Sequence, residues 1–234
     1  MLQLLQKIDF MDWIAEASKC PVLQGVSPDE LLSLFERIQF QVRRYRKGEL
    51  LAFQGDEVNR LMILLEGSTR GEMTDSSGQV IKIEDVSAPR PLAGAFLFGQ
   101  ESRFPVDVIA NEPLKVLVIY KDEFLKLLTM DQRILVNYLN LVGSKAQFLT
   151  TRIKFLSFKT IKGKLAHYIT GLNREGRNRV AIPVSQQDLA DLFGVARPSV
   201  ARGLSELEKE GVLEVKNRQV RILSRTRLKR YLEE

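Results

Sequence analysis

The sequence has few of the residues that most metal, redox and catalytic sites require. Among its 234 residues there is one cysteine, Cys20, and one histidine, His167. A single cysteine excludes an internal disulfide framework and a cysteine-ligated iron–sulfur cluster. There is no apolar run long enough for a transmembrane helix, and the first residues lack the cleavage site of a signal peptide. We therefore expect a cytoplasmic protein with no membrane partner.

Positive charge is concentrated in the C-terminal third. The formal charge of the whole chain is +6 at pH 7. Residues 158–234 hold 16 Lys and Arg against 9 Asp and Glu, so this third carries +7 and the first 157 residues carry −1. A basic module beside a near-neutral one is typical of polyanion binding, although a solvated surface would give the same charge.

The segment from residue 40 to residue 120 has the pattern of a β-structure. Short apolar stretches alternate with Gly, Asp, Asn and Pro, which predicts an antiparallel β sandwich or roll. Before it, Ser27, Pro28 and Glu30 form a capping-box pattern that predicts a helix start. A cupin-like metal enzyme would need several histidines in this roll, and it has none. We therefore expect no enzymatic activity.

An apolar repeat follows between about residue 130 and residue 158. Its members recur in steps of four and three, which is the 3.5-residue spacing of a helical zipper. They are Leu135, Leu139, Val142, Ala146, Leu149, Ile153 and Leu156. Such a seam predicts a two-fold helix pair and hence a homodimer. The alternative is that the stripe packs on the chain's own β domain, and one long helix could do both.

The C-terminal third has the element order of a winged helix-turn-helix. We expect a helix over 159–173, a strand over 179–184, a helix capped by Ser185, a turn at Gly194, and a second helix. A hairpin with Asn217 near its tip and a basic helical tail complete the chain. The sequence thus predicts an α+β protein with three parts. They are a jelly-roll-like β-roll sensor domain (1–129), a dimerisation helix (130–157) and a winged helix-turn-helix (158–234).

The two helices of this motif share a candidate core. Its members are Leu189, Leu192, Phe193, Val195, Val200, Leu204 and Leu207. With that face buried, Arg197, Ser199 and Arg202 lie on the open face of the second helix, as does Ser205. An arginine there can donate two parallel hydrogen bonds to guanine in the major groove.

Other polar residues of the motif are placed to contact the DNA backbone. Ser185, Gln186 and Gln187 begin the first helix, where side chains and backbone N–H groups can meet phosphate. Lys216 and Arg218 lie on the hairpin and can hold the flanking backbone. We expect a double-stranded DNA operator with two symmetric half-sites; a plain helical hairpin with surface arginines is the alternative.

The chain resembles the Crp/Fnr family of bacterial transcription regulators over nearly its whole length. KGELLAFQGDEVNRLMILLEG (47–67) is similar to the cyclic-nucleotide-binding roll pattern, and SQQDLADLFGVARPSVARGLSELEKEGVL (185–213) is similar to the family's DNA-binding signature. The zipper lies where that family dimerises. The resemblance implies that Arg197 and Arg202 occupy base-reading positions and that RNA polymerase is a partner. Next to the first arginine the family often has a glutamate, whereas this chain has Pro198. The family's usual operator half-site therefore cannot be assumed for this chain.

The sensor segment departs further from the family pattern. Cyclic-AMP-binding members supply a glutamate for the ribose and an arginine for the cyclic phosphate, in a cassette that corresponds to residues 91–110. The resemblance places these positions at Gly94 and Phe104, or, one residue along, at Ala95 and Pro105. Arg103 is close but displaced. We take Gly94, Ala95, Arg103 and Phe104 as candidate effector residues, and expect either an effector other than cyclic AMP or a closed core.

Three alternatives to this picture stay open. A haem-sensing regulator would need an axial ligand such as Cys20 or a methionine, because His167 lies in the DNA-binding third. Cys20 is also a candidate redox-sensing thiol, with Lys19 as its only evident basic neighbour. The third alternative is a ligand-binding interaction module that does not contact DNA. The sequence does not identify the effector, the operator, the target genes, or whether the protein activates or represses.

Overall fold

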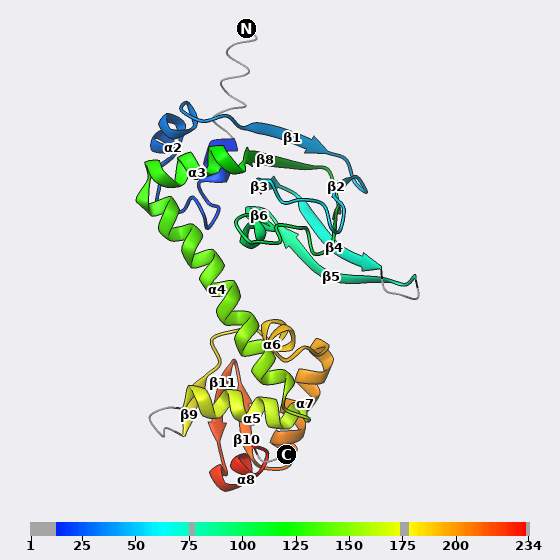
Figure 1. The fold of residues 1–234 in the computed structure, drawn as a ribbon. Coiled ribbons are helices and arrows are strands. Elements are labelled where there is room, and N and C mark those ends of the chain that lie inside the picture. The colour runs from blue at the N-terminus through cyan, green and yellow to red at the C-terminus, as the bar shows by residue number, and fades with distance from the viewer. Residues whose placement is uncertain (1–12, 75–77, 174–177, 233–234) are drawn as a thin grey trace. The chain divides into compact units, whose positions relative to one another are not determined.

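A computed structural model describes residues 13–74, 78–173 and 178–232 (Figure 1). The chain divides into two compact units, Met1–Lys145 and Ala146–Glu234. The first unit contains most of the strands, and the second holds a small mixed module of helices and three strands. The predicted α+β class is confirmed.

Capping residues define the start of α2 (Pro28–Phe35). The Ser27 hydroxyl accepts a hydrogen bond from the Glu30 N–H at 3.3 Å, and the Glu30 carboxylate accepts one from the Ser27 N–H at 2.8 Å. This reciprocal pair satisfies two helix-end donors, as the sequence predicted. Arg133 also donates to the Glu30 carboxylate at 2.9 Å and lowers the pKa of Glu30 to about 2.

The described strands of the first unit form two four-stranded antiparallel sheets. One sheet has the order β1-β8-β3-β6 and the other has the order β2-β7-β4-β5. The strands are β1 (Gln41–Tyr45), β2 (Leu50–Ala52), β3 (Arg60–Glu66), β4 (Ser68–Thr74), β5 (Val80–Ser87), β6 (Arg90–Leu92), β7 (Asp107–Ala110) and β8 (Leu114–Tyr120). A short helix, η1 (Gly94–Phe96), follows β6. The two sheets confirm the predicted roll.

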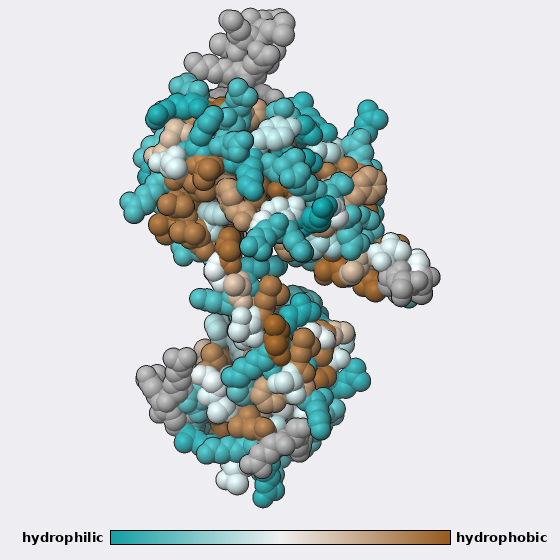
Figure 2. Space-filling model, viewed as in Figure 1, coloured by the Kyte–Doolittle hydropathy of each residue, from teal (hydrophilic) through white to brown (hydrophobic). Residues whose placement is uncertain are grey.

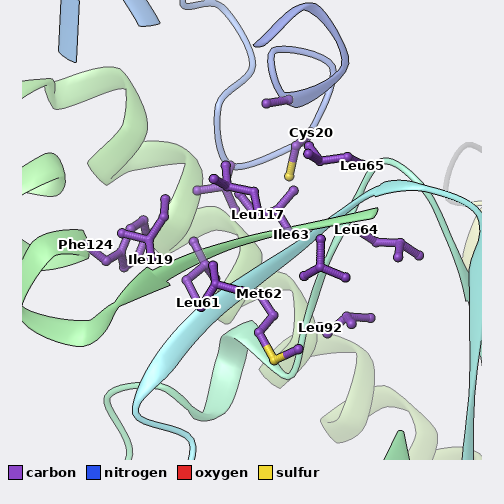
Figure 3. Close-up of a cluster of buried hydrophobic side chains, with 14 of the residues drawn as sticks. Cys20, Leu61, Met62, Ile63, Leu64, Leu65, Leu92, Leu117, Ile119 and Phe124 are labelled. Carbon is purple, nitrogen blue, oxygen red and sulfur yellow. The ribbon is translucent and has the colours of Figure 1, made fainter. Parts of the chain in front are cut away.

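The core of the first unit is built around its two central strands, β3 and β8. Both carry consecutive apolar residues that are buried on each face, at 61–65 on β3 and 116–119 on β8. Figure 3 shows this cluster, with Phe124 on one side and Cys20 on the other. Burial of each such side chain contributes about 1.5–3 kcal/mol, so these two strands contribute substantially to the stability of the unit.

β5 is an edge strand that exposes apolar side chains. Val80, Ile81 and Ile83 are all exposed, and hydrophobic colour follows the arm that β4 and β5 form in Figure 2. Lys82 and Asp85 form an ion pair on the same strand at 2.7 Å. Charges on an edge strand oppose edge-to-edge pairing with other chains.

Two helices follow the roll, α3 (Lys121–Met130) and α4 (Gln132–Leu156). Asp131 separates them, because its backbone is extended. Its carboxylate accepts from the Arg133 N–H at 2.8 Å and so caps the start of α4. The long helix expected over 130–157 is therefore present with nearly the predicted ends.

The second unit has the predicted order of elements. They are α5 (Ile161–Leu172), β9 (Arg179–Ala181), α6 (Gln186–Phe193), α7 (Arg197–Lys209), β10 (Leu213–Lys216), β11 (Gln219–Ile222) and α8 (Arg225–Arg230). The three strands form one sheet with the order β10-β11-β9. The strand expected over 179–184 ends at Ala181, because Ala181 pairs with Gln219, the first residue of β11, and the hairpin turn before Gln219 offers no further strand to pair with.

Candidate nucleic-acid interface

Helices α6 and α7 pack over a small apolar core in the second unit. Leu189, Phe193, Val200, Leu204 and Leu207 are buried, and the remaining two members of the predicted set are partly buried beside them. The ring of Phe193 lies 4.8 Å from that of Phe155, centroid to centroid. The core that the sequence predicted between the two helices is therefore confirmed.

The start of α6 is fixed by a second capping box. The Ser185 hydroxyl accepts from the Asp188 N–H at 3.1 Å, and the Asp188 carboxylate accepts from the Ser185 N–H at 2.8 Å. The Ser185 N–H lowers the pKa of Asp188, so the carboxylate is ionised at neutral pH. Gln187 donates to Asp191 at 2.9 Å. Two of the three predicted phosphate-contact side chains are thus engaged locally, while helix geometry leaves the N–H groups of Gln186 and Gln187 without an intrahelical acceptor.

Gly194 makes the turn between the two helices. Its φ is +67°, in the left-handed region that favours glycine. A Cβ at this position would lie 3.1 Å from Cδ2 of Leu156, so the turn is also closely packed. The predicted turn residue is confirmed for both reasons.

One face of α7 presents arginines to solvent. The helix begins at Arg197, with Pro198 in its first turn where no N–H is required. Arg197 and Arg202 are exposed, Ser205 is exposed and Ser199 is half-buried. Within the described residues neither arginine forms an ion pair with an acidic side chain. Both guanidinium groups therefore keep their donors available.

Charge is divided along the length of α7. The acidic residues lie in its second half, where Glu206 pairs with Lys162 at 3.3 Å and Glu208 accepts from the Val215 N–H at 2.7 Å. The arginines lie in the first half. Because a helix N-terminus also carries partial positive charge, the first half of α7 is the part suited to an anionic ligand.

The hairpin β10–β11 ends in a two-residue turn. Asn217 and Arg218 have φ of +49° and +64°, the pattern of a type I′ turn. Lys216 and Arg218 are exposed at this turn. The predicted hairpin tip is confirmed, and it carries the two basic residues proposed to contact the DNA backbone.

A buried lysine on α5 contacts the end of α6, and the sequence pattern did not predict this contact. Lys164 is 7% exposed, and its ammonium donates to the Phe193 carbonyl at 2.9 Å. Burial lowers the pKa of Lys164. This bond satisfies a carbonyl at the C-terminal end of α6 and ties α5 to the turn before α7. The only sign of this contact in the sequence is the position of Lys164 among apolar residues on one face of the helix.

Comparison with known proteins agrees with this geometry. The family model for the cyclic nucleotide-binding domain matches residues 42–131, and that for the Crp-like helix-turn-helix domain matches residues 163–231. A solved transcriptional regulator from Thermotoga maritima is 33% identical, with a TM-score of 0.50, over 55% of this chain and 98% of that one. The chain belongs to the Crp/Fnr family of transcription regulators.

Two further relatives extend over most of this Crp/Fnr regulator. The cyclic AMP receptor protein of Thermus thermophilus is 26% identical over 196 residues, which cover 82% of this chain and 88% of that protein. The solved catabolite activator protein of Thermus thermophilus is 22% identical with a TM-score of 0.53, covering 91% and 98% of the two chains. The latter similarity shows a shared fold.

The four candidate effector residues of this Crp/Fnr regulator lie in different surroundings. Gly94 is buried in η1 and Ala95 beside it is half-buried. Phe104 is 2% exposed and belongs to the core of the first unit. Arg103 is exposed and donates to the Gly55 carbonyl at 2.8 Å. The two positions that the family resemblance assigns to a carboxylate and a guanidinium thus hold buried residues without an ionisable group.

The segment that the family resemblance matched to a cassette is attached to α4 by a buried hydrogen bond, which the sequence pattern did not predict. The Tyr138 hydroxyl donates to the Gly94 carbonyl at 2.9 Å. Burial raises the pKa of Tyr138. A Cβ on Gly94 would lie 3.3 Å from Cδ2 of Leu141 on the same helix. Tyr138 falls outside the predicted zipper positions, so periodicity alone did not single it out.

The predicted zipper residues divide between two surroundings. Leu135 and Val142 are partly buried and pack on the core of the first unit. The other five are exposed: Leu139, Ala146, Leu149, Ile153 and Leu156. Part of the stripe therefore packs on its own unit and the rest is exposed, and the helix pair stays a prediction.

The structure gives little support to the other sensing chemistries. Cys20 is fully buried, and burial raises the pKa of its thiol to about 11, so it lacks the thiolate that redox sensing requires. His167 lies on α5 between the rings of Phe155 and Phe158, at 5.7 and 4.8 Å. Among the described residues no cluster of three His, Cys, Asp or Glu side chains is placed to hold a metal ion. Within the same part of the chain, no helix is both long and apolar enough to span a membrane.

Proposed function

We propose that this Crp/Fnr regulator binds a two-fold symmetric DNA operator as a homodimer. The observation that carries the proposal is the face of α7 on which Arg197 and Arg202 are exposed and have no acidic partner among the described residues, while the opposite face is buried. In this arrangement the two arginines and Ser199 read base edges. Pro198 offers no acceptor for an amino group, so specificity rests on these donors and on DNA shape.

The surrounding residues position the protein on the DNA backbone. In the proposal, the N–H groups of Gln186 and Gln187 at the start of α6 meet one phosphate, and Ser185 lies beside them. Lys216 and Arg218 at the hairpin turn contact the backbone on the other side of α7. These contacts set the register but carry no sequence information.

The exposed stripe of α4 supports the dimer. Ile153 is 70% exposed and Leu139 is 59% exposed, and the spacing of the stripe fits a parallel helix pair. A second copy of the same helix would cover both residues. Two half-sites about 34 Å apart would then accept the two recognition helices in successive major grooves.

We propose that the effector is not cyclic AMP. In support, Gly94 and Phe104 are buried where a carboxylate and a guanidinium would be needed. In the proposed scheme, an effector in the roll changes the population of α4 arrangements and hence the separation of the recognition helices. The three-part division at 129 and 157, the cytoplasmic location and the contact with RNA polymerase belong to the same proposal.

The test begins with selection of an operator from a random duplex library. Fluorescence anisotropy then compares wild-type protein with Arg197→Ala and Arg202→Ala. Loss of a bidentate base contact costs about 1–3 kcal/mol, or roughly 5- to 150-fold in affinity. Arg37→Ala, an exposed arginine of the first unit, is the matched control and should bind as wild type. Wild-type affinity in both α7 variants would overturn the site assignment, and absence of any selected duplex would favour the interaction module.

A further inference from the structure

The last helix of the chain carries a basic surface that the proposed operator contacts do not use. β11 runs from Gln219, next to the hairpin turn, to Ile222, and Ser224 then caps α8. Four residues of strand span about 13 Å. Helix α8 is therefore at the end of the hairpin opposite Asn217 and Arg218, away from the turn assigned to the operator backbone.

One side of α8 is anchored in the second unit. Leu228 is 3% exposed in the core, and Tyr231 packs against the same core. The Tyr231 hydroxyl donates to the Glu210 carboxylate, and Arg227 donates to the Glu210 carbonyl at 3.0 Å. These contacts fix which side of the short helix faces solvent, and they engage Arg227 within the protein.

The solvent side of α8 is lined by three cations and a hydroxyl. Arg225 and Lys229 are four residues apart, as are Thr226 and Arg230, so each pair lies on one side of the helix. Together these four residues line an open depression of about 410 Å³. Arg225 donates to the Asn178 side chain at 2.9 Å, which holds its guanidinium in place.

The charge around this depression is unbalanced. Residues 215–234 contain seven Lys and Arg against two acidic residues, Glu233 and Glu234. Lys229 and Arg230 are exposed, and no described acidic side chain forms an ion pair with either. Like charges one helical turn apart repel one another, so an anion at this surface would relieve that repulsion.

We infer that this face of α8 binds phosphate groups. Guanidinium, ammonium and hydroxyl donors match the acceptor oxygens of a phosphate, and none of the described residues that line the depression carries a carboxylate. The phosphate can come from the backbone of DNA that continues beyond the operator, or from a soluble phosphorylated molecule. The site is separate from the recognition helix and goes beyond the proposed reading of two half-sites.

The experiment uses full-length protein and three probes. One probe is inorganic pyrophosphate, followed by isothermal titration calorimetry. The other two are duplexes of about 24 and about 60 base pairs centred on the selected operator, followed by anisotropy over a range of NaCl concentrations. The test variant is Lys229→Gln with Arg230→Gln. The charge-matched control is Lys159→Gln with Lys209→Gln, two exposed lysines of the second unit outside α8.

Each source of phosphate gives a distinct result. If DNA is the source, the test variant should lose roughly fivefold or more on the long duplex only, with a salt slope smaller by about 0.9 per lost phosphate contact. If a soluble molecule is the source, the binding heat of pyrophosphate should disappear in the test variant while both duplexes bind unchanged. The control should behave as wild type with every probe.

Two results would overturn the inference. One is that the test variant behaves as the control variant does with all three probes, because unchanged binding in both would show that α8 binds no phosphate and an equal loss in both would be an effect of net charge. The other is an equal loss on the short and long duplexes without loss of pyrophosphate binding, which would place these residues within the operator contact. The charge-preserving variant Lys229→Arg with Arg230→Lys should retain binding, which separates a folding defect from lost charge. Failure of the DNA-binding function itself would appear differently, as wild-type protein that binds neither duplex.

Discussion

The Tyr138 hydroxyl donates a buried hydrogen bond to the Gly94 carbonyl, 2.9 Å away. This bond joins α4, which presents the exposed apolar stripe, to η1, which lies in the segment that the family resemblance matched to an effector cassette. Phe98 and Phe124 pack on the ring of Tyr138, with centroids 5.7 and 5.2 Å away. A change in η1 would therefore act directly on α4.

Replacing Tyr138 with phenylalanine should destabilise the first unit by about 0.5–1.5 kcal/mol, because the buried Gly94 carbonyl would keep only the long hydrogen bond from the Leu97 N–H, at 3.5 Å. Urea unfolding followed by the fluorescence of Trp13 measures this change. Trp13 is the sole tryptophan and lies in the core of the first unit. Tyr120→Phe removes an exposed hydroxyl and should leave the midpoint unchanged. Equal midpoints for all three proteins would show that the bond contributes nothing.

Replacing Ile153 with glutamate should split the proposed dimer without unfolding the chain. The side chain is 70% exposed in the single chain, so the glutamate meets water unless a second copy covers it. Sedimentation velocity should show a dimer for the wild type and a monomer for the variant. Ser144→Glu, an exposed position off the seam, should remain dimeric. A dimeric Ile153→Glu protein would mean that the interface lies elsewhere.

Replacing Arg218 with glycine should have opposite effects on stability and on DNA binding. Arg218 has a φ of +64°, and a left-handed residue other than glycine costs about 1–2 kcal/mol. The variant should therefore unfold at a higher temperature, followed by circular dichroism, yet bind the operator more weakly. Asn217→Gly should change stability less, since asparagine tolerates this conformation, and should bind normally. Unchanged operator affinity of Arg218→Gly would remove Arg218 from the backbone contacts.

His167 should make the second unit less stable in mild acid. Burial, and then the charge of Lys154, lower the pKa of His167 below its usual value of 6.5. The unfolded chain therefore binds a proton more readily, and stability rises with pH through the window between the folded pKa and 6.5. Above 6.5 this contribution is complete, and it is lost as the pH falls through the folded value.

The measurement compares thermal unfolding of wild type and His167→Gln at about pH 7 and about pH 5. The wild type should lose more stability than the variant over this interval. Carboxylates that titrate in the same range are common to both proteins, so their effect cancels in the difference. Parallel losses in the two proteins would show that His167 titrates normally.

Short-range signals predicted most of the second unit. Ser185 and Asp188 are three residues apart, and Gly194 and Asn217 each adopt the left-handed conformation that their side chains allow. Such features depend on neighbouring residues alone, so the sequence was sufficient for them. The bond from Lys164 to Phe193 spans 29 positions and that from Tyr138 to Gly94 spans 44, and no local pattern specifies either pair.

Periodicity predicted α4 but not the surroundings of each residue on it. All seven members of the stripe have the same spacing, yet Leu135 and Val142 meet the core of the first unit while Ile153 meets solvent. A hydrophobic repeat predicts that one face of a helix is buried, but it does not predict which surface buries that face. The surroundings of the candidate effector residues could not be predicted for the same reason. The burial of Phe104 depends on how the first unit packs and not on the residues next to it in sequence.

The length of α4 is itself constrained, because one unbroken helix carries the whole stripe. Inserting a single residue after Gly143 would turn the later members of the stripe by about 100° around the helix axis relative to the earlier ones. A seven-residue insertion would shift them by only about 20°. Natural variation in this helix should therefore favour gains and losses of whole heptads. The heptad register of the stripe is thus a property of the whole helix, and the two halves of α4 cannot change length independently.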